Sequence, residues 1–112
     1  MYREMIVVES KKELIELINQ RIKEQGPNCD LNDIDVSGIT DMSYVFSTLP
    51  FNGDISEWDV SNVKNMYGMF SRSQFSGDIS QWNVGKVRNM KYMFYDSPLE
   101  GKEPEWCKNS LK

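Results

Sequence analysis

Apolar and polar positions along this chain repeat with a period of 24 residues. Three units in register begin at Ile34, Trp58 and Trp82, and Trp106 continues the same column. A fixed period of this size is typical of repeat proteins, in which each unit buries its apolar residues against the next. The pattern therefore predicts that equivalent side chains of neighbouring units stack into one apolar core.

Each unit combines two local patterns. Its first part alternates apolar and polar positions around Trp58 and Val60, which predicts a short strand with one buried face. Its second part places a capping residue, Asn65, before apolar residues at helical spacing from Met66 to Phe70, which predicts a helix of one to two turns. A glycine that closes each unit is predicted to make a tight turn with positive φ: Gly53, Gly77 and Gly101.

The two ends of the chain depart from the repeat. Residues 11–25 form an amphipathic pattern with Ser10 as a possible N-cap, and Gly26 followed by Pro27 predicts where this helix stops. Residues 1–8 are predicted to be a leading strand or arm. We therefore expect one domain, with an N-terminal cap at 1–33, three repeats at 34–105 and a C-terminal cap at 106–112.

The composition is that of one small acidic domain. The chain has 112 residues, of which 13 are basic and 17 acidic, for a formal net charge of −4. This balance argues against a nucleic-acid partner, which would require a basic face. The longest apolar run is too short to span a membrane, and no signal sequence opens the chain. We expect a cytoplasmic protein without a membrane partner, or a surface or virion-associated one if it belongs to a larger precursor or assembly.

The side chains present exclude several kinds of chemistry. Histidine is absent, which removes the usual general base and the commonest metal ligand. Asp35 and Asp59 share a column and could act together on a glycoside, but stacked solvent-facing carboxylates are a commoner cause of such a pair. The Asp-rich segment 52–59 lacks the alternating spacing of calcium loops, and Cys29 and Cys107 fall in different columns, which predicts two unpaired thiols. We expect no catalytic residue, no cofactor and no metal site.

The candidate binding surface is the outward face of the predicted strands. If Trp58 and Val60 point inward, then the residues that alternate with them point outward. This face is acidic toward the N-terminal units and neutral toward the middle, so it would favour a protein partner with a basic segment. A face that is merely solvated is the alternative. The predicted binding residues are Asp33, Asp35, Glu57, Asp59, Gln81 and Asn83.

Two long segments carry a family resemblance. Gly53–Phe70 reads GDISEWDVSNVKNMYGMF, and Gly77–Phe94 reads GDISQWNVGKVRNMKYMF. Both resemble the repeat of the BspA-like leucine-rich repeat family, a group of bacterial surface proteins whose units run close to DISxWDVSNVxNMxxMF. Residues 12–46 resemble the entry segment of such proteins. The resemblance implies a role in adhesion, and similar stretches also occur in phage-borne and mobile-element genes.

Pattern and resemblance together predict an α+β repeat fold. The expected architecture is a short leucine-rich-repeat-like right-handed solenoid with a small parallel β-ladder, one short helix per coil and an N-terminal capping helix. The expected function is non-catalytic protein–protein recognition on the outward face of the ladder. Two alternatives stay open: a structural or assembly component, phage or mobile-element encoded, and a fragment of a bacterial surface adhesin.

Overall fold

The N-terminal helix α1 spans Lys11–Gln25 in the computed structural model, which describes residues 4–108. It begins where the Ser10 side chain accepts a hydrogen bond at 3.1 Å from the amide three residues later, and it ends at Gly26, whose φ is 90°. The predicted helix and both of its boundaries are confirmed. Within residues 4–108, no helix has both the length and the apolar composition of a membrane span. The side chains that α1 buries are Leu14 and Ile18.

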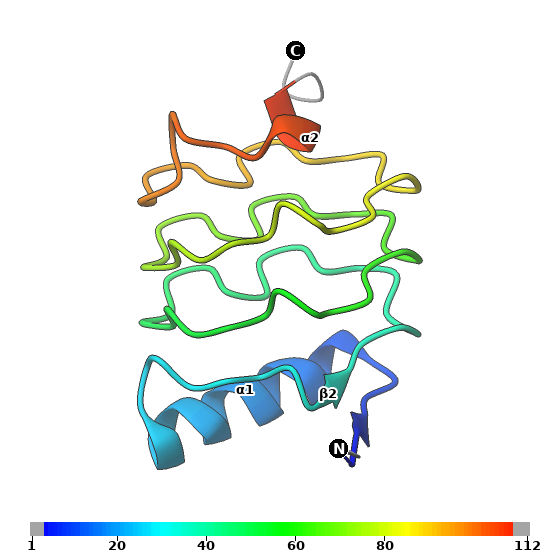
Figure 1. Cartoon of the computed structure of the whole chain (residues 1–112), viewed down its shortest axis with the longest axis vertical. Helices are drawn as coiled ribbons and strands as arrows, with labels where there is room; N and C mark the ends of the chain where they lie inside the picture. The colour runs from blue at the N-terminus through cyan, green and yellow to red at the C-terminus, as the bar shows by residue number, and fades with distance from the viewer. Residues whose placement is uncertain (1–3, 109–112) are drawn as a thin grey trace.

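Two short strands and a second helix complete the regular elements of the described chain. Strand β1 (Ile6–Val7) pairs in parallel with strand β2 (Ile34–Asp35), with Ile6 opposite Ile34. Figure 1 shows α1 at one end of the molecule and helix α2 (Glu105–Lys108) at the other. The predicted leading strand is present at Ile6–Val7, whereas residues 1–3 of that segment and residues 109–112 of the predicted C-terminal cap lie outside the described residues.

The predicted fold class is wrong. We expected a leucine-rich-repeat-like solenoid with a parallel β-ladder and one short helix per coil. Between β2 and α2, the described chain has turns in place of these strands and helices, and its parallel pairing there is limited to isolated bridges that include Asp41 with Asn65 and Asn65 with Asn89. The molecule is a compact domain, 38 × 27 × 25 Å in extent, with a two-stranded sheet and two helices among the described residues.

Left-handed residues explain why the predicted short helices do not form. The Asp41 side chain accepts the Ser43 amide at 2.9 Å, which closes an Asx turn in place of a helix cap. Tyr44 and Thr48 then have φ values of 61° and 63°, and a right-handed helix does not continue through a residue with positive φ. The following units are left-handed at the same two columns: Gly68 with Arg72, and Tyr92 with Asp96.

Alternate amides in these turns bond to the neighbouring unit. The amides of Met42, Tyr44, Phe46 and Thr48 donate to carbonyls 23 residues further along the chain, at 2.8 to 3.1 Å. The intervening amides donate back within their own turns, as Val45 does to the Met42 carbonyl. Because both sets are paired, the turns satisfy these backbone groups without forming long strands.

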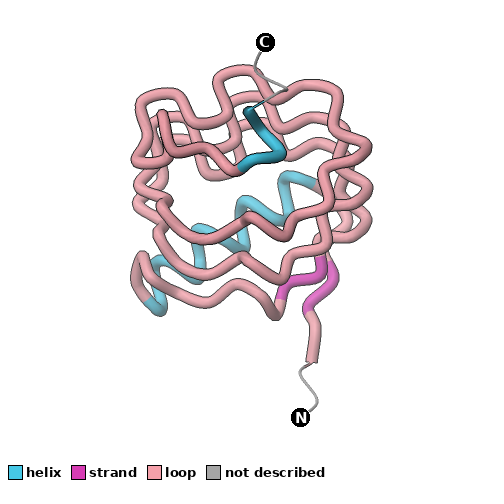
Figure 2. The backbone as a smooth tube through the Cα atoms, turned by 45° about the horizontal axis from the view of Figure 1, so that its top comes forward, coloured by secondary structure: helices cyan, strands magenta, loops and turns pink. Residues whose placement is uncertain are grey.

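The core is built from stacked aromatic rings. Phe46, Phe70 and Phe94 stack with centroids 5.4 and 5.6 Å apart and planes within 3° of parallel. Phe51 and Phe75 form a second stack with centroids 6.0 Å apart. Figure 2 shows the backbone loops of the successive units, and Figure 1 shows the two helices at opposite ends of the molecule. The predicted core positions, Trp58, Val60, Met66 and Phe70 among them, are confirmed as buried.

Each indole ring is hydrogen-bonded to a carbonyl three positions before the equivalent residue of the preceding repeat. A buried tryptophan N–H needs an acceptor, and here each N–H donates to a carbonyl 27 residues earlier, at 2.9 to 3.1 Å. The pairs are Trp58 with Leu31, Trp82 with Ile55 and Trp106 with Ile79.

The three positions that close the units require glycine for different structural reasons. The predicted positive φ is confirmed at Gly101, where φ is 84°, and is wrong at Gly53 and Gly77. At Gly53 the reason is close packing, since a β-carbon there would lie 1.8 Å from the Cys29 carbonyl oxygen. At Gly77 a β-carbon would lie 2.8 Å from the Phe75 ring.

Candidate functional site

Three of the predicted binding residues form turns with their side chains. Asp35, Asp59 and Asn83 each accept the amide of the residue two positions later, at 2.9, 3.0 and 3.0 Å. Asp59 also accepts the Ser61 hydroxyl at 2.6 Å. One oxygen of each side chain is therefore engaged in shaping the chain itself. These residues lie in one column, as the repeat predicted.

The other three predicted residues differ among themselves. Asp33 forms two hydrogen bonds with the Arg21 guanidinium of α1, at 2.9 and 2.7 Å, and this ion pair fixes the helix to the start of the repeats. Glu57 and Gln81 are exposed. The Glu57 amide donates to the Asn32 side chain at 2.9 Å, so its backbone is held by the N-terminal cap. A partner on this surface stays a prediction.

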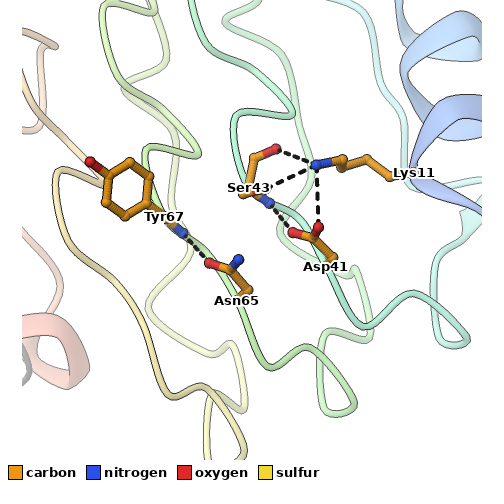
Figure 3. Close-up of polar contacts among 5 residues, drawn as sticks. All are labelled: Lys11, Asp41, Ser43, Asn65 and Tyr67. Atoms are coloured by element: carbon orange, nitrogen blue, oxygen red, sulfur yellow. Dashed lines mark hydrogen bonds and ion pairs between the residues drawn. The ribbon is translucent and has the colours of Figure 1, made fainter.

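The Asx turns of neighbouring units carry different side chains at one position. In Figure 3, Asp41 accepts the Ser43 amide and pairs with Lys11 of α1 at 3.3 Å, while Lys11 also donates to the Ser43 hydroxyl at 2.9 Å. In the next unit, Asn65 accepts the Tyr67 amide at 2.9 Å. Tyr67 thus takes the position of Ser43, and its ring lies away from α1 (Figure 3). The same turn holds α1 in one unit and presents an aromatic ring in the next.

These hydrogen bonds set the charge state of the turns. The hydroxyl and amide of Ser37 lower the pKa of Asp35. Burial alone would raise the pKa of Asp41, but the hydrogen bonds from Ser43 and Lys11 outweigh it, and the net shift is downward. Both carboxylates are therefore stabilised in their ionised form.

The two cysteines are buried thiols. Burial raises the pKa of Cys29, and it raises the pKa of Cys107 to about 11. A thiol with a raised pKa is protonated at neutral pH, and it is a poor nucleophile. Within residues 4–108, no group of three or more Cys, Asp or Glu side chains is arranged to hold a metal ion.

Four tyrosines form a row on the outer side of the turns. Successive ring centroids are 5.4 Å apart from Tyr44 to Tyr67, 5.7 Å from Tyr67 to Tyr92 and 6.0 Å from Tyr92 to Tyr95. The rings meet edge to face, at interplanar angles of 62°, 75° and 83°. Tyr44, Tyr92 and Tyr95 are 53%, 59% and 46% exposed, unusually high for large aromatic side chains on one surface.

The tyrosine row lines a groove of about 380 Å³. The Arg72 guanidinium lies over the Tyr95 ring, 5.7 Å from its centroid. Aromatic rings with a few polar groups are the usual lining of a binding site. We call the following residues the tyrosine groove: Tyr44, Ser47, Thr48, Tyr67, Ser71, Arg72, Tyr92 and Tyr95.

A second hollow of similar volume lies beside α1. Its lining includes Arg21 and Asp33, together with Glu4, Gln25 and Asp30. Because Arg21 and Asp33 are hydrogen-bonded to each other, they already satisfy much of the polar demand of this hollow. The tyrosine groove is therefore the better candidate site.

The tyrosine groove was not among the predicted sites. Tyr44 and Tyr92 share a column with Gly68, whereas Tyr67 stands one position earlier and Tyr95 three positions later, so the sequence shows no tyrosine column. The available signal was a tyrosine two positions after one buried residue and one position before the next: Tyr44 between Met42 and Val45, and Tyr92 between Met90 and Met93. Only the turn geometry brings the four rings together.

The comparison with known proteins places this chain in a family. Residues 15–108 match the family model described as "Mycoplasma protein of unknown function, DUF285", and the chain belongs to this family. No curated protein and no solved structure matches the chain significantly. The predicted kinship with a family of bacterial repeat proteins is confirmed at this coarser level.

Proposed function

We propose that this chain is a non-catalytic protein-recognition module and that the tyrosine groove is its binding surface. The main support is the exposure of Tyr44, Tyr92 and Tyr95 on turns whose backbone is hydrogen-bonded to neighbouring units. Tyrosine and arginine contribute strongly to protein interfaces, because they offer a large apolar surface with a polar end. The groove lining holds hydroxyl groups and a guanidinium but no carboxylate, thiol or imidazole, which suits binding better than proton transfer.

The backbone of the groove gives independent support. Tyr44 and Tyr92 are left-handed, which costs a residue other than glycine about 1 kcal/mol or more. Gly68 has the same φ in the same column, where glycine adopts it without this cost. Edge-to-face ring contacts return about 0.5–1.5 kcal/mol. Tyrosine at these positions is therefore hard to attribute to backbone stability, and partner binding supplies a reason for it.

A second candidate surface is the predicted face with Glu57, Asp59 and Gln81. Its exposed acidic side chains would favour a basic segment of a partner. It ranks below the tyrosine groove because Asp59, like the other Asx residues of its column, already uses one oxygen inside its own turn.

The family supports two biological settings for such a module. It is a repeat family related to BspA-like surface proteins, and the segment Gly53–Phe70 resembles the repeat of those proteins. We propose surface adhesion as one setting, with binding to a host protein. Assembly into a larger complex is the other, and in that setting the groove would bind a subunit of the same complex.

The proposal is tested by comparing capture of a partner by three forms of the full chain. The first is the unchanged protein, the second carries Tyr44→Gly and Tyr92→Gly, and the third carries Glu57→Lys and Asp59→Lys. Each is immobilised, exposed to cell extract from the source organism and from a candidate host, and its bound proteins are identified by mass spectrometry.

We expect the glycine variant to fold and to lose a partner that the lysine variant retains. The purified partner should then bind the unchanged chain in solution with a defined stoichiometry. If the glycine variant captures the partner as well as the unchanged protein does, the tyrosine groove is not the binding surface. Loss of capture by the lysine variant alone would assign binding to the predicted acidic face instead.

A further inference from the structure

Charge is distributed unevenly along the chain. Residues 1–59 carry five basic and twelve acidic residues, whereas residues 60–95 carry five basic residues and one acidic residue. Although the overall net charge is −4, this segment of the second and third units is basic. Its charged residues are Lys64, Arg72, Lys86, Arg88 and Lys91, with Asp78 as the single acid.

One of these basic residues lines the tyrosine groove, and a second lies beside it. Arg72 is part of its lining, and its amide donates to the Tyr95 carbonyl at 2.8 Å. The Lys91 carbonyl accepts the Gly68 amide at 2.9 Å, which places Lys91 next to Tyr67. Desolvation and the neighbouring Tyr44 raise the pKa of Tyr67, while the positive charge of Lys91 acts in the opposite direction.

Other basic residues extend this positive region. The Arg88 amide donates to the Lys64 carbonyl at 2.8 Å, so these two exposed residues stand in one column beside the groove-forming turns. Acidic residues lie at the two ends. At one end Asp41 is paired with Lys11 at 3.3 Å. At the other end the exposed Asp96 follows Tyr95, and Glu100 and Glu103 line a separate hollow with Tyr92 and Tyr95. Asp78 lies elsewhere, in a hollow with Gly53 and Asp54. The middle of the groove therefore carries a net positive charge.

The ring geometry limits the shape of the ligand. Because neighbouring rings stand at 62° to 83° to each other, they form notches rather than a flat platform. Nucleic-acid bases or sugar rings would have to stack on the faces of the tyrosine rings, and those faces would then have to point toward solvent. Notches between aromatic rings fit the side chains of an extended peptide, as aromatic-lined grooves do for proline-rich segments.

We infer that the tyrosine groove binds an extended acidic segment of a partner protein, with Arg72 and Lys91 contacting its carboxylates and the tyrosine notches holding its apolar side chains. This inference rests on the proposed function and adds the chemistry of the partner. It differs from the basic partner predicted for the Glu57 and Asp59 face. The two surfaces would thus select partners of opposite charge.

The test uses the full chain and short synthetic peptides as probes. One peptide alternates glutamate with proline, a second alternates lysine with proline, and a third alternates serine with proline. An oligothymidylate serves as a probe for nucleic acid. Binding is measured by chemical-shift changes of the tyrosine rings and by calorimetry at low and moderate salt.

We expect the glutamate–proline peptide to shift the tyrosine signals and to bind more weakly as salt increases, because salt screens the contacts to Arg72 and Lys91. Changing Arg72→Glu and Lys91→Glu should weaken binding by about tenfold or more. The matched control changes Lys12→Glu and Lys102→Glu, which alters the net charge equally at exposed positions outside the groove, and it should leave binding within about twofold.

Three results would overturn the inference. They are equal binding of the serine or lysine peptide, tighter binding of the oligothymidylate, and absence of tyrosine shifts with every probe. The two proposals fail in different ways. If captured protein depends on Tyr44 and Tyr92 but not on Arg72 and Lys91, the groove is a recognition site and its acidic specificity is wrong. If capture is independent of the tyrosines, the proposed function itself fails.

Discussion

Two rows of aromatic rings arise from the same turns and differ in how they follow the repeat. The inner row, Phe46, Phe70 and Phe94, keeps one ring per unit, and its planes lie within 3° of parallel. The outer row of tyrosines changes column from unit to unit, and its rings meet at 62° to 83°. A buried position tolerates little change of shape, because the interior is close-packed. Solvent imposes no such constraint, so the side chains of the outer row can change from unit to unit.

The largest expected effect comes from breaking the inner row. Phe70→Ala removes a buried ring that stacks on Phe46 and Phe94, and it should lower the free energy of unfolding by about 3–5 kcal/mol. Urea denaturation followed by tryptophan fluorescence measures this loss. Tyr92→Gly is the matched change in the outer row and should alter stability by less than about 1 kcal/mol. Similar losses for the two variants would contradict the contrast between the rows.

The next effect tests how the units are tied to one another. Trp82→Phe keeps most of the buried ring but removes the N–H that donates to the Ile55 carbonyl at 3.1 Å. Leaving that acceptor without its partner should cost about 1–3 kcal/mol. Trp106→Phe is the comparison, because Trp106 is only partly buried and water can replace its donor. A larger loss at Trp106 than at Trp82 would argue against this explanation.

A smaller effect is expected where the outer row lacks a side chain. Gly68→Ala adds a β-carbon at a φ of 60°, with the Tyr44 ring 2.7 Å away. The left-handed backbone should cost about 1 kcal/mol, and the mobile ring can move aside at little further cost. Thermal denaturation gives the change in stability, and tyrosine ring signals report the movement of Tyr44. If the alanine variant is more stable than the unchanged chain, the left-handed backbone at position 68 does not carry the expected cost for alanine.

The smallest expected effect on stability comes from the Asx turn at Asp41. This turn binds α1 through Lys11 and lies next to the outer row. The native pKa of Asp41 is lowered, so its contribution is present above the unfolded value of about 3.9 and is lost as pH falls through the native pKa. Asp41→Asn keeps the Asx turn, as Asn65 does in the next unit, but removes this charge. Urea midpoints between neutral pH and about pH 3 should therefore fall less steeply for the asparagine variant. Parallel pH profiles would refute a role for the Asp41 charge.

Particular residues explain which predictions from the sequence succeeded. Ser10 and Gly26 mark the ends of α1 by local hydrogen bonding and local backbone freedom, and such effects act within a few residues. Trp58, Val60 and Phe70 are buried as predicted. Large apolar side chains that recur at a fixed period lower the free energy by packing together away from water. Both results depend on nearest neighbours or on the repeat itself.

The predictions from the sequence that were wrong failed because contacts between distant residues decide the structure at those positions. The pattern that begins at Asp41 fits a helix cap and an Asx turn equally well, since the same oxygen accepts an amide in both. What separates them is the left-handed backbone at Tyr44 and Thr48, and that backbone is stabilised by amides that bond to a unit 23 residues away. A short helix is too weak alone to compete with such contacts. The prediction of one helix per unit therefore failed.

The amino-acid sequence by itself determined the 24-residue unit, the helix at its N-terminal side and the identity of the buried side chains, because these follow from local capping and from the burial of apolar surface. The tertiary structure alone decided that the units are built from turns, that aspartates thought to face a partner also shape those turns, and that four scattered tyrosines meet at one groove. Such features depend on hydrogen bonds and ring contacts between residues far apart in the chain, and their geometry cannot be read from the order of the residues.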